Sequence, residues 1–256
     1  MDIRQRKSWN ILLVGDFCLD VYHYGVCERM SPEAPVPVFK ETNRENRLGM
    51  SGNVKLNLES LGFNVTHLHN TEEIKKHRFV EERYGQQLFR HDEGEKSKVK
   101  PLQKIPDGEF DAVVVSDYDK GFITSNSFKY LKKQLRSSTP FFVDSKKRDL
   151  RMFENCIVKI NNLEASKATF GTTQEVVVTL GSNGASWKNK IFKTDKVDVF
   201  DVCGAGDVFL AALVYGYLNY EDMQKAIILA NKCASLSVTK MCKYVLKSSD
   251  IRNIGE

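Results

Sequence analysis

Three small residues lie between two acids in the stretch 201–207, which reads DVCGAGD. Gly204, Ala205 and Gly206 carry little side-chain bulk, so their backbone N–H groups can approach a ligand closely. A long apolar run follows and predicts a buried helix that begins at about Asp207. The first N–H groups of a helix have no partner within it, and the helix dipole adds positive potential there. The stretch therefore predicts an anion site.

Asp207, at the mouth of this anion site, allows two interpretations. As a helix cap, its carboxylate would only accept a backbone N–H. As a base beside a bound phosphate, it could take a proton from an attacking hydroxyl. The stretch by itself favours the cap, and the other motifs of the chain favour the base.

Short apolar runs that end in polar residues indicate the elements that must position this site. Because they alternate with helical segments, they predict an α/β fold with a doubly wound, mostly parallel sheet flanked by helices. The predicted buried strands are 9–16, 111–117, 140–144, 156–161 and 175–181. Ligands of such sheets bind beyond the carboxyl ends of the strands, which is where Asp16 and Asp20 are expected. The alternative is that these two acids only end a strand and cap a turn.

Two segments with extended character predict a small β-sheet set apart from the main one. Segment 21–40 surrounds a proline-rich link, and segment 77–91 contains a Tyr-Gly turn between two arms. We expect them to form a lid over the substrate. Between them, the small-residue turn 49–53 precedes a helical pattern, so Asn53 is either a helix cap or a ligand.

Composition describes an ordinary globular protein of 256 residues, with 41% hydrophobic and 28% charged residues. The net charge of +5 is too dispersed to indicate nucleic acid and suits anionic small molecules. Six cysteines show neither CxxC pairs nor zinc spacing, which is typical of a reducing cytosol. No signal or membrane segment is found, and no GxGxxG follows the first strand, which argues against a dinucleotide-dependent dehydrogenase. We expect a cytoplasmic protein without nucleic-acid or membrane partners.

Taken together, the motifs resemble those of the ribokinase-like sugar kinases, the phosphofructokinase-B type. DVCGAGD resembles the C-terminal signature of that family, N-x-x-E at 161–164 its metal-side element, and 178–185 its nucleotide loop. Asp16, Asp20 and the turn 49–53 lie where the family has sugar-binding motifs. The resemblance covers nearly the whole chain and implies a single ribokinase-like kinase domain over 1–256 with a β-sheet lid.

By this resemblance, the chain would transfer the γ-phosphoryl group of ATP to a sugar hydroxyl. Asp207 would be the base, Gly204, Ala205 and Gly206 the anion hole, and Glu164 the residue that holds Mg²⁺. The nucleotide positions would be Asn161, Thr179, Gly181, Gly184 and Asn231. The positions for sugar hydroxyls would be Asp16, Asp20, Gly49 and Asn53. Candidates for a sugar phosphate are Arg78, Arg90, Lys120 and Lys146, each of which is also compatible with a solvated surface charge.

Within the family, several stretches are similar to bacterial D-glycero-D-manno-heptose-7-phosphate kinases. They are 15–20, 31–38, 86–88, 116–121 and the Asp-Val opening of the signature. This similarity implies phosphorylation of a heptose 7-phosphate at its anomeric hydroxyl, a step of lipopolysaccharide precursor biosynthesis. A flat lid with edge strands also predicts a possible homodimer through the lid.

The chain departs from the family pattern in four places. Met50 stands where the family has the second glycine of a pair, and 64–76 and 164–175 are shorter than usual. At 241–244, MCKY replaces a glycine-containing turn. Two alternatives follow: a kinase of the same fold for another sugar or sugar phosphate, or a catalytically silent relative that binds a sugar or nucleotide.

Overall fold

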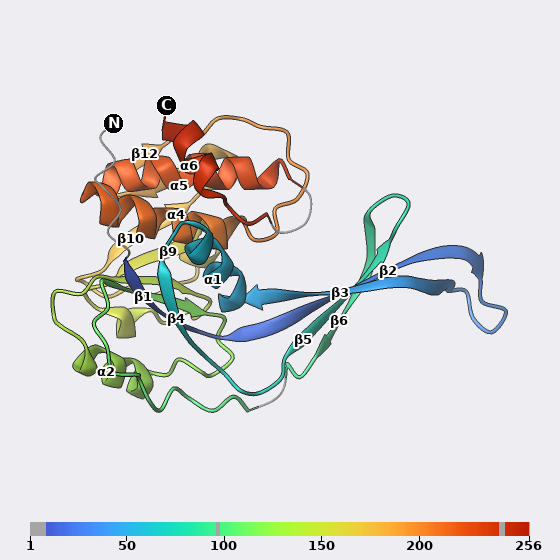
Figure 1. Ribbon diagram of the computed structural model, residues 1–256, viewed down its shortest axis with the longest axis horizontal. Helices are drawn as coiled ribbons and strands as arrows, with labels where there is room; N and C mark the ends of the chain where they lie inside the picture. The colour runs from blue at the N-terminus through green and yellow to red at the C-terminus, as the bar shows by residue number, and fades with distance from the viewer. Residues whose placement is uncertain (1–8, 96–97, 241–243, 256) are drawn as a thin grey trace.

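The structure is a computed structural model that describes residues 9–95, 98–240 and 244–255. It contains a body with helices on both faces of a large sheet, and a smaller sheet that extends from one edge of the body (Figure 1). The departure expected at 241–244 falls outside the described residues, apart from Tyr244. No described helix is both long and apolar enough to cross a membrane.

The main sheet has eight strands in the order β12-β11-β10-β9-β8-β7-β1-β4. All neighbours from β4 to β10 are parallel, and β11 and β12 add an antiparallel edge. The strands are β1 (Asn10–Gly15), β4 (Asn64–His69), β7 (Ala112–Asp117), β8 (Phe141–Ser145), β9 (Ile157–Asn161), β10 (Glu175–Thr179), β11 (Ala185–Trp187) and β12 (Lys190–Phe192). This confirms the predicted doubly wound, mostly parallel sheet.

Helices cover the two faces unequally. On one face lie α1 (Ser51–Ser60), α4 (Ala205–Tyr220), α5 (Met223–Val238) and α6 (Ser248–Gly255), and on the other lies α2 (Ser125–Gln134) (Figure 1). In β1, Ile11 and Leu13 pack in the core with α4, whereas Leu12 and Val14 pack in the core with α2. Because both faces of β1 are buried, the strand is an unbroken apolar run.

The smaller sheet, called the lid sheet below, has the order β3-β2-β5-β6. Its strands are β2 (Phe17–Met30), β3 (Pro37–Met50), β5 (Lys75–Glu81) and β6 (Gln86–Glu93). They extend beyond the predicted segments 21–40 and 77–91. The largest difference is the charged stretch 40–47, which has no apolar alternation but pairs with β2 along its length. Only Asp16 separates β1 from β2, so the chain passes directly from the main sheet into the lid sheet.

Two unusual backbone conformations lie at the helix starts that face the site. Gly204, the N-cap of α4, has φ 83° and makes no side-chain cap, and α4 begins two residues earlier than predicted. Asp207 is therefore the third residue of the helix and not its cap. Met50, the N-cap of α1, has φ 52° and ψ −127°, a region that favours glycine. Glycine has no Cβ and adopts this backbone conformation readily, so a glycine suits position 50.

Candidate active site

A cavity of about 530 Å³ opens at the carboxyl ends of the main-sheet strands, beside the N-terminus of α4. Seven of the predicted site residues line it, namely Lys146, Asn161, Thr179, Gly181, Gly204, Gly206 and Asp207. Three further lining residues have charged or hydroxyl side chains and were missed from the sequence: Tyr118, Asp144 and Lys159. The cavity thus joins the signature turn to the ends of β7, β8, β9 and β10.

The Asp207 carboxylate lies buried between two uncharged donors. The amide of Asn53 donates to Oδ2 at 2.7 Å, and the hydroxyl of Tyr118 donates to Oδ1 at 3.4 Å. Asn53 belongs to the first turns of α1, whose N-cap is Met50, so it does not cap its own helix. Asn53 and Asp207 are 154 residues apart in the chain. The arrangement places a buried carboxylate beside the N-terminus of α4.

Lys159 brings a buried ammonium to the N-terminus of α4. It lies in the middle of β9 with 3% of its surface exposed, and its Nζ is 2.7 Å from Oδ2 of Asp144. A Cβ added to Gly206 would lie 2.8 Å from the same Nζ. Gly206 therefore leaves room for the Lys159 ammonium beside the N-terminus of α4. The ammonium and the positive end of the helix dipole both face the cavity.

Asp144 lines the same cavity, and Glu164 lies beside it, paired with the lining residue Lys146. Burial raises the pKa of Asp144, but Lys159 and Lys146 outweigh it and leave the pKa below its ordinary value. Among the described residues, Oδ1 of Asp144 has no hydrogen-bond partner, and Lys146 Nζ lies 3.5 Å away. That Nζ is 2.7 Å from Glu164 Oε1. Carboxylate oxygens of this kind suit Mg²⁺, which binds to one or two carboxylates and completes its shell with phosphates and water.

The N-x-x-E spacing has a local structural cause. The Asn161 side chain accepts from the N–H of Glu164 at 2.8 Å, and Oε2 of Glu164 accepts from the N–H of Asn161 at 3.1 Å. This is a capping box at the start of the short helix α3 (Asn162–Ala165). It orients Glu164 with Oε1 toward Lys146. The Asn161 side chain itself is occupied by the cap.

A second, mostly apolar pocket of about 240 Å³ adjoins the cavity and shares Thr179, Gly181 and Gly206 with it. Gly184 and Asn231 also line it, so four predicted nucleotide positions meet here. The Asn231 amide donates to the Phe192 carbonyl at 2.7 Å and braces the wall. Gly184 has φ 89°, and a Cβ there would lie 2.0 Å from the Phe192 carbonyl oxygen, so a side chain is excluded.

The base of the lid sheet brings together three predicted sugar-side residues. Asp20 is fully buried, and Oδ1 accepts from Arg78 Nη2 at 2.9 Å. A Cβ on Gly49 would lie 2.5 Å from the other oxygen of Asp20, so only glycine fits beside that carboxylate. Burial lowers the pKa of Arg78, but Asp20, with smaller contributions that include Cys203, raises it above its ordinary value. Asn53, three residues beyond the end of β3, donates to Asp207 of α4, so the lid base lies near α4.

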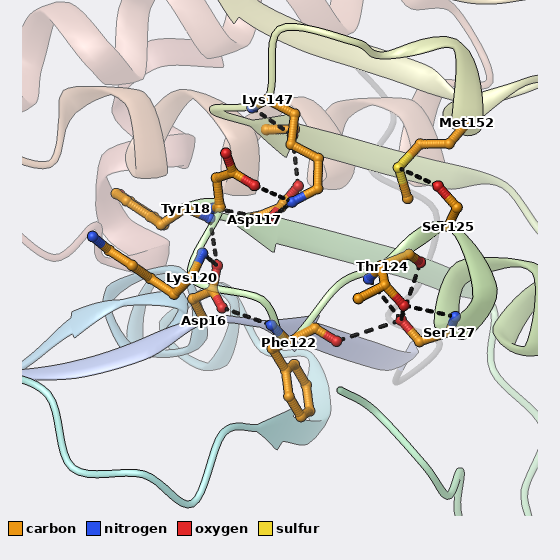
Figure 2. Close-up of polar contacts among 12 residues, drawn as sticks. Asp16, Asp117, Tyr118, Lys120, Phe122, Thr124, Ser125, Ser127, Lys147 and Met152 are labelled. Carbon is orange, nitrogen blue, oxygen red and sulfur yellow. Dashed lines mark hydrogen bonds and ion pairs between the residues drawn. The ribbon is translucent and has the colours of Figure 1, made fainter. Parts of the chain in front are cut away.

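Asp16, predicted to bind a sugar hydroxyl, accepts hydrogen bonds from backbone N–H groups. Figure 2 shows its carboxylate beside the loop after β7. Oδ2 accepts from the N–H groups of Tyr118 at 2.8 Å and Lys120 at 3.1 Å, and Oδ1 accepts from Phe122 at 3.3 Å. The sequence offered no sign of this loop contact, because more than a hundred residues separate the partners.

Two of the predicted phosphate-binding cations are paired away from the cavity. Arg90, on β6, is half exposed and forms an ion pair with Asp92. Lys120 forms an ion pair with Glu95. Of the other two candidates, Lys146 lines the cavity and Arg78 lies at the lid base beside Asp20.

Comparisons with known proteins agree with this architecture. Residues 124–244 match the pfkB family of carbohydrate kinases. The bifunctional protein HldE of Campylobacter jejuni is 31% identical over 99% of this chain and 66% of its own length. HldE of Nitratiruptor sp. is 32% identical over 90% of this chain and 62% of its own length. The chain thus spans slightly less than two thirds of these relatives.

Solved structures show the same fold at low sequence identity. Ribokinase from Thermotoga maritima superposes with a TM-score of 0.70 at 16% identity, covering 96% of this chain and 99% of that one. Phosphofructokinase-2 from Escherichia coli gives a TM-score of 0.72 at 15% identity, covering 97% and 98%. The predicted ribokinase-like fold is confirmed. The family match over 124–244 and the HldE relatives confirm the predicted resemblance of the chain to the pfkB carbohydrate kinases.

Proposed function

We propose that this chain transfers the γ-phosphoryl group of ATP to a hydroxyl of a sugar phosphate, and specifically to the anomeric hydroxyl of a heptose 7-phosphate. One observation carries the proposal. The buried Asp207 carboxylate, held by Asn53, lies at the N-terminus of α4, with the two pockets on one side and the lid base on the other.

The two adjoining pockets suit the two parts of ATP. The apolar pocket of about 240 Å³ would take the adenine, and the charged cavity would take the phosphates. The backbone N–H groups at Gly204, Ala205 and Gly206, together with the Lys159 ammonium, would stabilise charge on the phosphoryl group in transfer. Catalysis of this reaction is mostly positioning and electrostatic stabilisation.

The chemical step needs one proton acceptor. The acceptor oxygen forms a bond to the γ-phosphorus while the bond from that phosphorus to the β-phosphate oxygen breaks. The proton of the acceptor hydroxyl passes to Asp207, and ADP leaves. Mg²⁺, held through Glu164 and Oδ1 of Asp144, would neutralise phosphate charge when bound.

The lid base would supply the sugar side. Asp20 and Asn53 would hydrogen-bond sugar hydroxyls beside Gly49, and Arg78 and Lys146 are the cations placed to meet the phosphate of the acceptor. Closure of the lid sheet would exclude water and limit hydrolysis of ATP. The heptose assignment is supported by the stretches similar to heptose-7-phosphate kinases and by the identity of about 30% with the HldE proteins.

An acceptor screen tests the function. The chain is incubated with ATP and Mg²⁺ and with each of a panel of sugars and sugar phosphates, and ADP release is measured. We expect release that depends on heptose 7-phosphate and a product phosphorylated at the anomeric carbon. Turnover of another sugar phosphate would correct the acceptor only. Absence of acceptor-dependent release across the panel would contradict the kinase and favour a silent binding relative.

We also propose that the chain pairs with a second copy through the lid sheet, in the cytoplasm. The support is a row of stacked aromatic rings across the sheet. The ring centroid of Phe79 lies 4.4 Å from that of His23 and 4.2 Å from that of Phe89, and Phe89 is half exposed. Light scattering should give the mass of a dimer for the parent and of a monomer for Phe89→Asp. A monomeric parent would contradict this arrangement.

A further inference from the structure

The loop between β7 and α2 is held on one side by Asp16. Its carboxylate accepts three backbone N–H groups, from Tyr118, Lys120 and Phe122 (Figure 2). Asp16 is fully buried, so these bonds replace all the water that the carboxylate had in the unfolded chain. The three donors alternate along the loop, and this spacing fixes its path over several residues.

Asp117 holds the same loop from the other side. Its Oδ2 accepts from the Ser145 hydroxyl at 2.6 Å, and its Oδ1 accepts from the Asp119 N–H at 3.0 Å. Lys147 Nζ lies 3.1 Å from Oδ1 of Asp117 and 2.6 Å from Asp119 (Figure 2). Tyr118 therefore stands between two anchored positions, and its backbone has little freedom.

The Tyr118 side chain projects from this anchored backbone to the cavity. Its hydroxyl is 3.4 Å from Oδ1 of Asp207, whereas Oδ2 is held by Asn53 at 2.7 Å. Of these two bonds, the one from Tyr118 to Oδ1 is therefore the longer. Catalytic hydrogen bonds are often long before substrate binds and shorten in the reactive complex.

We propose that Tyr118 is a positioning residue that holds Oδ1 of Asp207 toward the acceptor hydroxyl, and that Asp16 acts on the reaction through Tyr118 and not as a sugar ligand. This inference rests on the proposed kinase function. Burial and the nearby Asp207 raise the pKa of Tyr118 well above its ordinary value. The phenol therefore remains protonated, donates to the carboxylate and does not compete with it as a base.

Tyr118→Phe removes the hydroxyl and keeps the ring. We expect kcat to fall about tenfold with the KM for ATP within about twofold of the parent. The acid limb of the kcat profile should move to higher pH, because a carboxylate that loses a donor binds its proton more tightly. The charged groups that share the cavity with Asp207 are Lys146, Lys159 and Asp144, and the substitution changes none of them. Tyr130→Phe, at an exposed position on α2, is the matched control.

A double-mutant cycle separates the two roles of Asp16. If Asp16 acts through Tyr118, Asp16→Asn lowers kcat in the parent and changes it less than about twofold in the Tyr118→Phe background. If Asp16 binds the sugar, Asp16→Asn raises the KM for the acceptor equally in both backgrounds, and the proposal is overturned. Thermal melts show which variants fold, and should Asp16→Asn not fold, Tyr118→Phe decides by itself.

A measurement without turnover distinguishes failure of this inference from failure of the proposed function. The ¹³Cγ resonance of Asp207 is followed through a pH titration in the parent and in Tyr118→Phe. A higher midpoint in the variant supports the positioning role even if no acceptor has been found. Identical midpoints, or an unchanged kcat profile in a folded Tyr118→Phe, overturn it.

Discussion

The two carboxylates that end β1 and β7, Asp16 and Asp117, and four glutamates of the lid sheet have pKa values shifted in opposite directions. Burial raises the pKa of Asp16 and Asp117, although hydrogen bonds and Lys147 partly oppose it. On the lid sheet the pKa is lowered at four glutamates, in each case chiefly by a side-chain hydrogen bond. The glutamate–donor pairs are Glu41–Arg44, Glu45–Arg47, Glu81–Arg83 and Glu93–His77.

This difference shows how the two sheets hold their parts of the site. The main sheet fixes its acids with backbone N–H groups and buried lysines, so its geometry exists before a ligand arrives. Apart from the buried Asp20–Arg78 pair, the ion pairs of the lid sheet have at least one partly exposed side chain, and such pairs are individually weak. A preformed phosphate side and a rearrangeable sugar side suit an enzyme that must close over its acceptor.

The largest effect should come from the base at the preformed side. Asp207→Asn keeps the shape of the side chain and removes its capacity to accept the proton. We expect kcat to fall by about 10²–10⁴-fold while the dissociation constant for ATP, measured by calorimetry, stays within about threefold of the parent. A variant that turned over at the parental rate would remove Asp207 from the role of base.

Lys159→Met tests the buried ammonium beside α4. Removing a charge that stabilises the transferring phosphoryl group should lower kcat by about 10²-fold. Because Asp144 then loses its 2.7 Å partner, stability should also fall by about 3 kcal/mol in urea melts. Lys132→Met, at a lysine on α2 that donates to the Glu154 carbonyl, is the control. Loss of stability with an unchanged kcat would make Lys159 a structural residue only.

Two arginines directly opposite each other on the lid sheet should differ sharply. Arg78 pairs with the buried Asp20, whereas Arg90 is half exposed and pairs with the partly buried Asp92. Arg78→Ala leaves a buried carboxylate uncompensated and should cost about 3 kcal/mol, and it should raise the KM for the acceptor. Arg90→Ala should cost less than about 0.5 kcal/mol. Equal losses would show that burial does not separate the two pairs.

Mild acid should loosen the lid sheet before the main sheet. The folded-state pKa of the four lid glutamates lies below the ordinary 4.5, so their stabilising effect is complete above pH 4.5 and is lost as pH falls through the folded values. Asp16 and Asp117 have folded pKa values above the ordinary 3.8, so acid favours their folded state. Hydrogen exchange at decreasing pH should rise first in β2, β3, β5 and β6. Simultaneous exchange in β1 and β7 would contradict the comparison.

Much of the fold was predictable from the sequence because its causes are local. The apolar run before Asp16 and the one before Asp117 are buried on both faces, and such runs predict parallel strands wherever they occur. The capping box of Asn161 and Glu164 spans one helical turn, so its spacing is visible in the chain. The charged β3 was predicted only in part, because its pairing with β2 does not depend on an apolar pattern.

The candidate site divides in the same way. The sequence by itself determined the small-residue turn before α4, the acid that follows it and the polar ends of the strands, since each depends on neighbours within a few residues. Only the tertiary structure decided that Asn53 contacts Asp207 and that Lys159 lies beside Gly206. It also decided that the Asp16 carboxylate accepts the N–H of Tyr118. The Asp16 contact follows from strand order, which places β1 beside β7, and the Asn53 contact follows from the packing of α1 against α4. Partners chosen by strand order can be any distance apart in the chain, and local pattern carries no information about them.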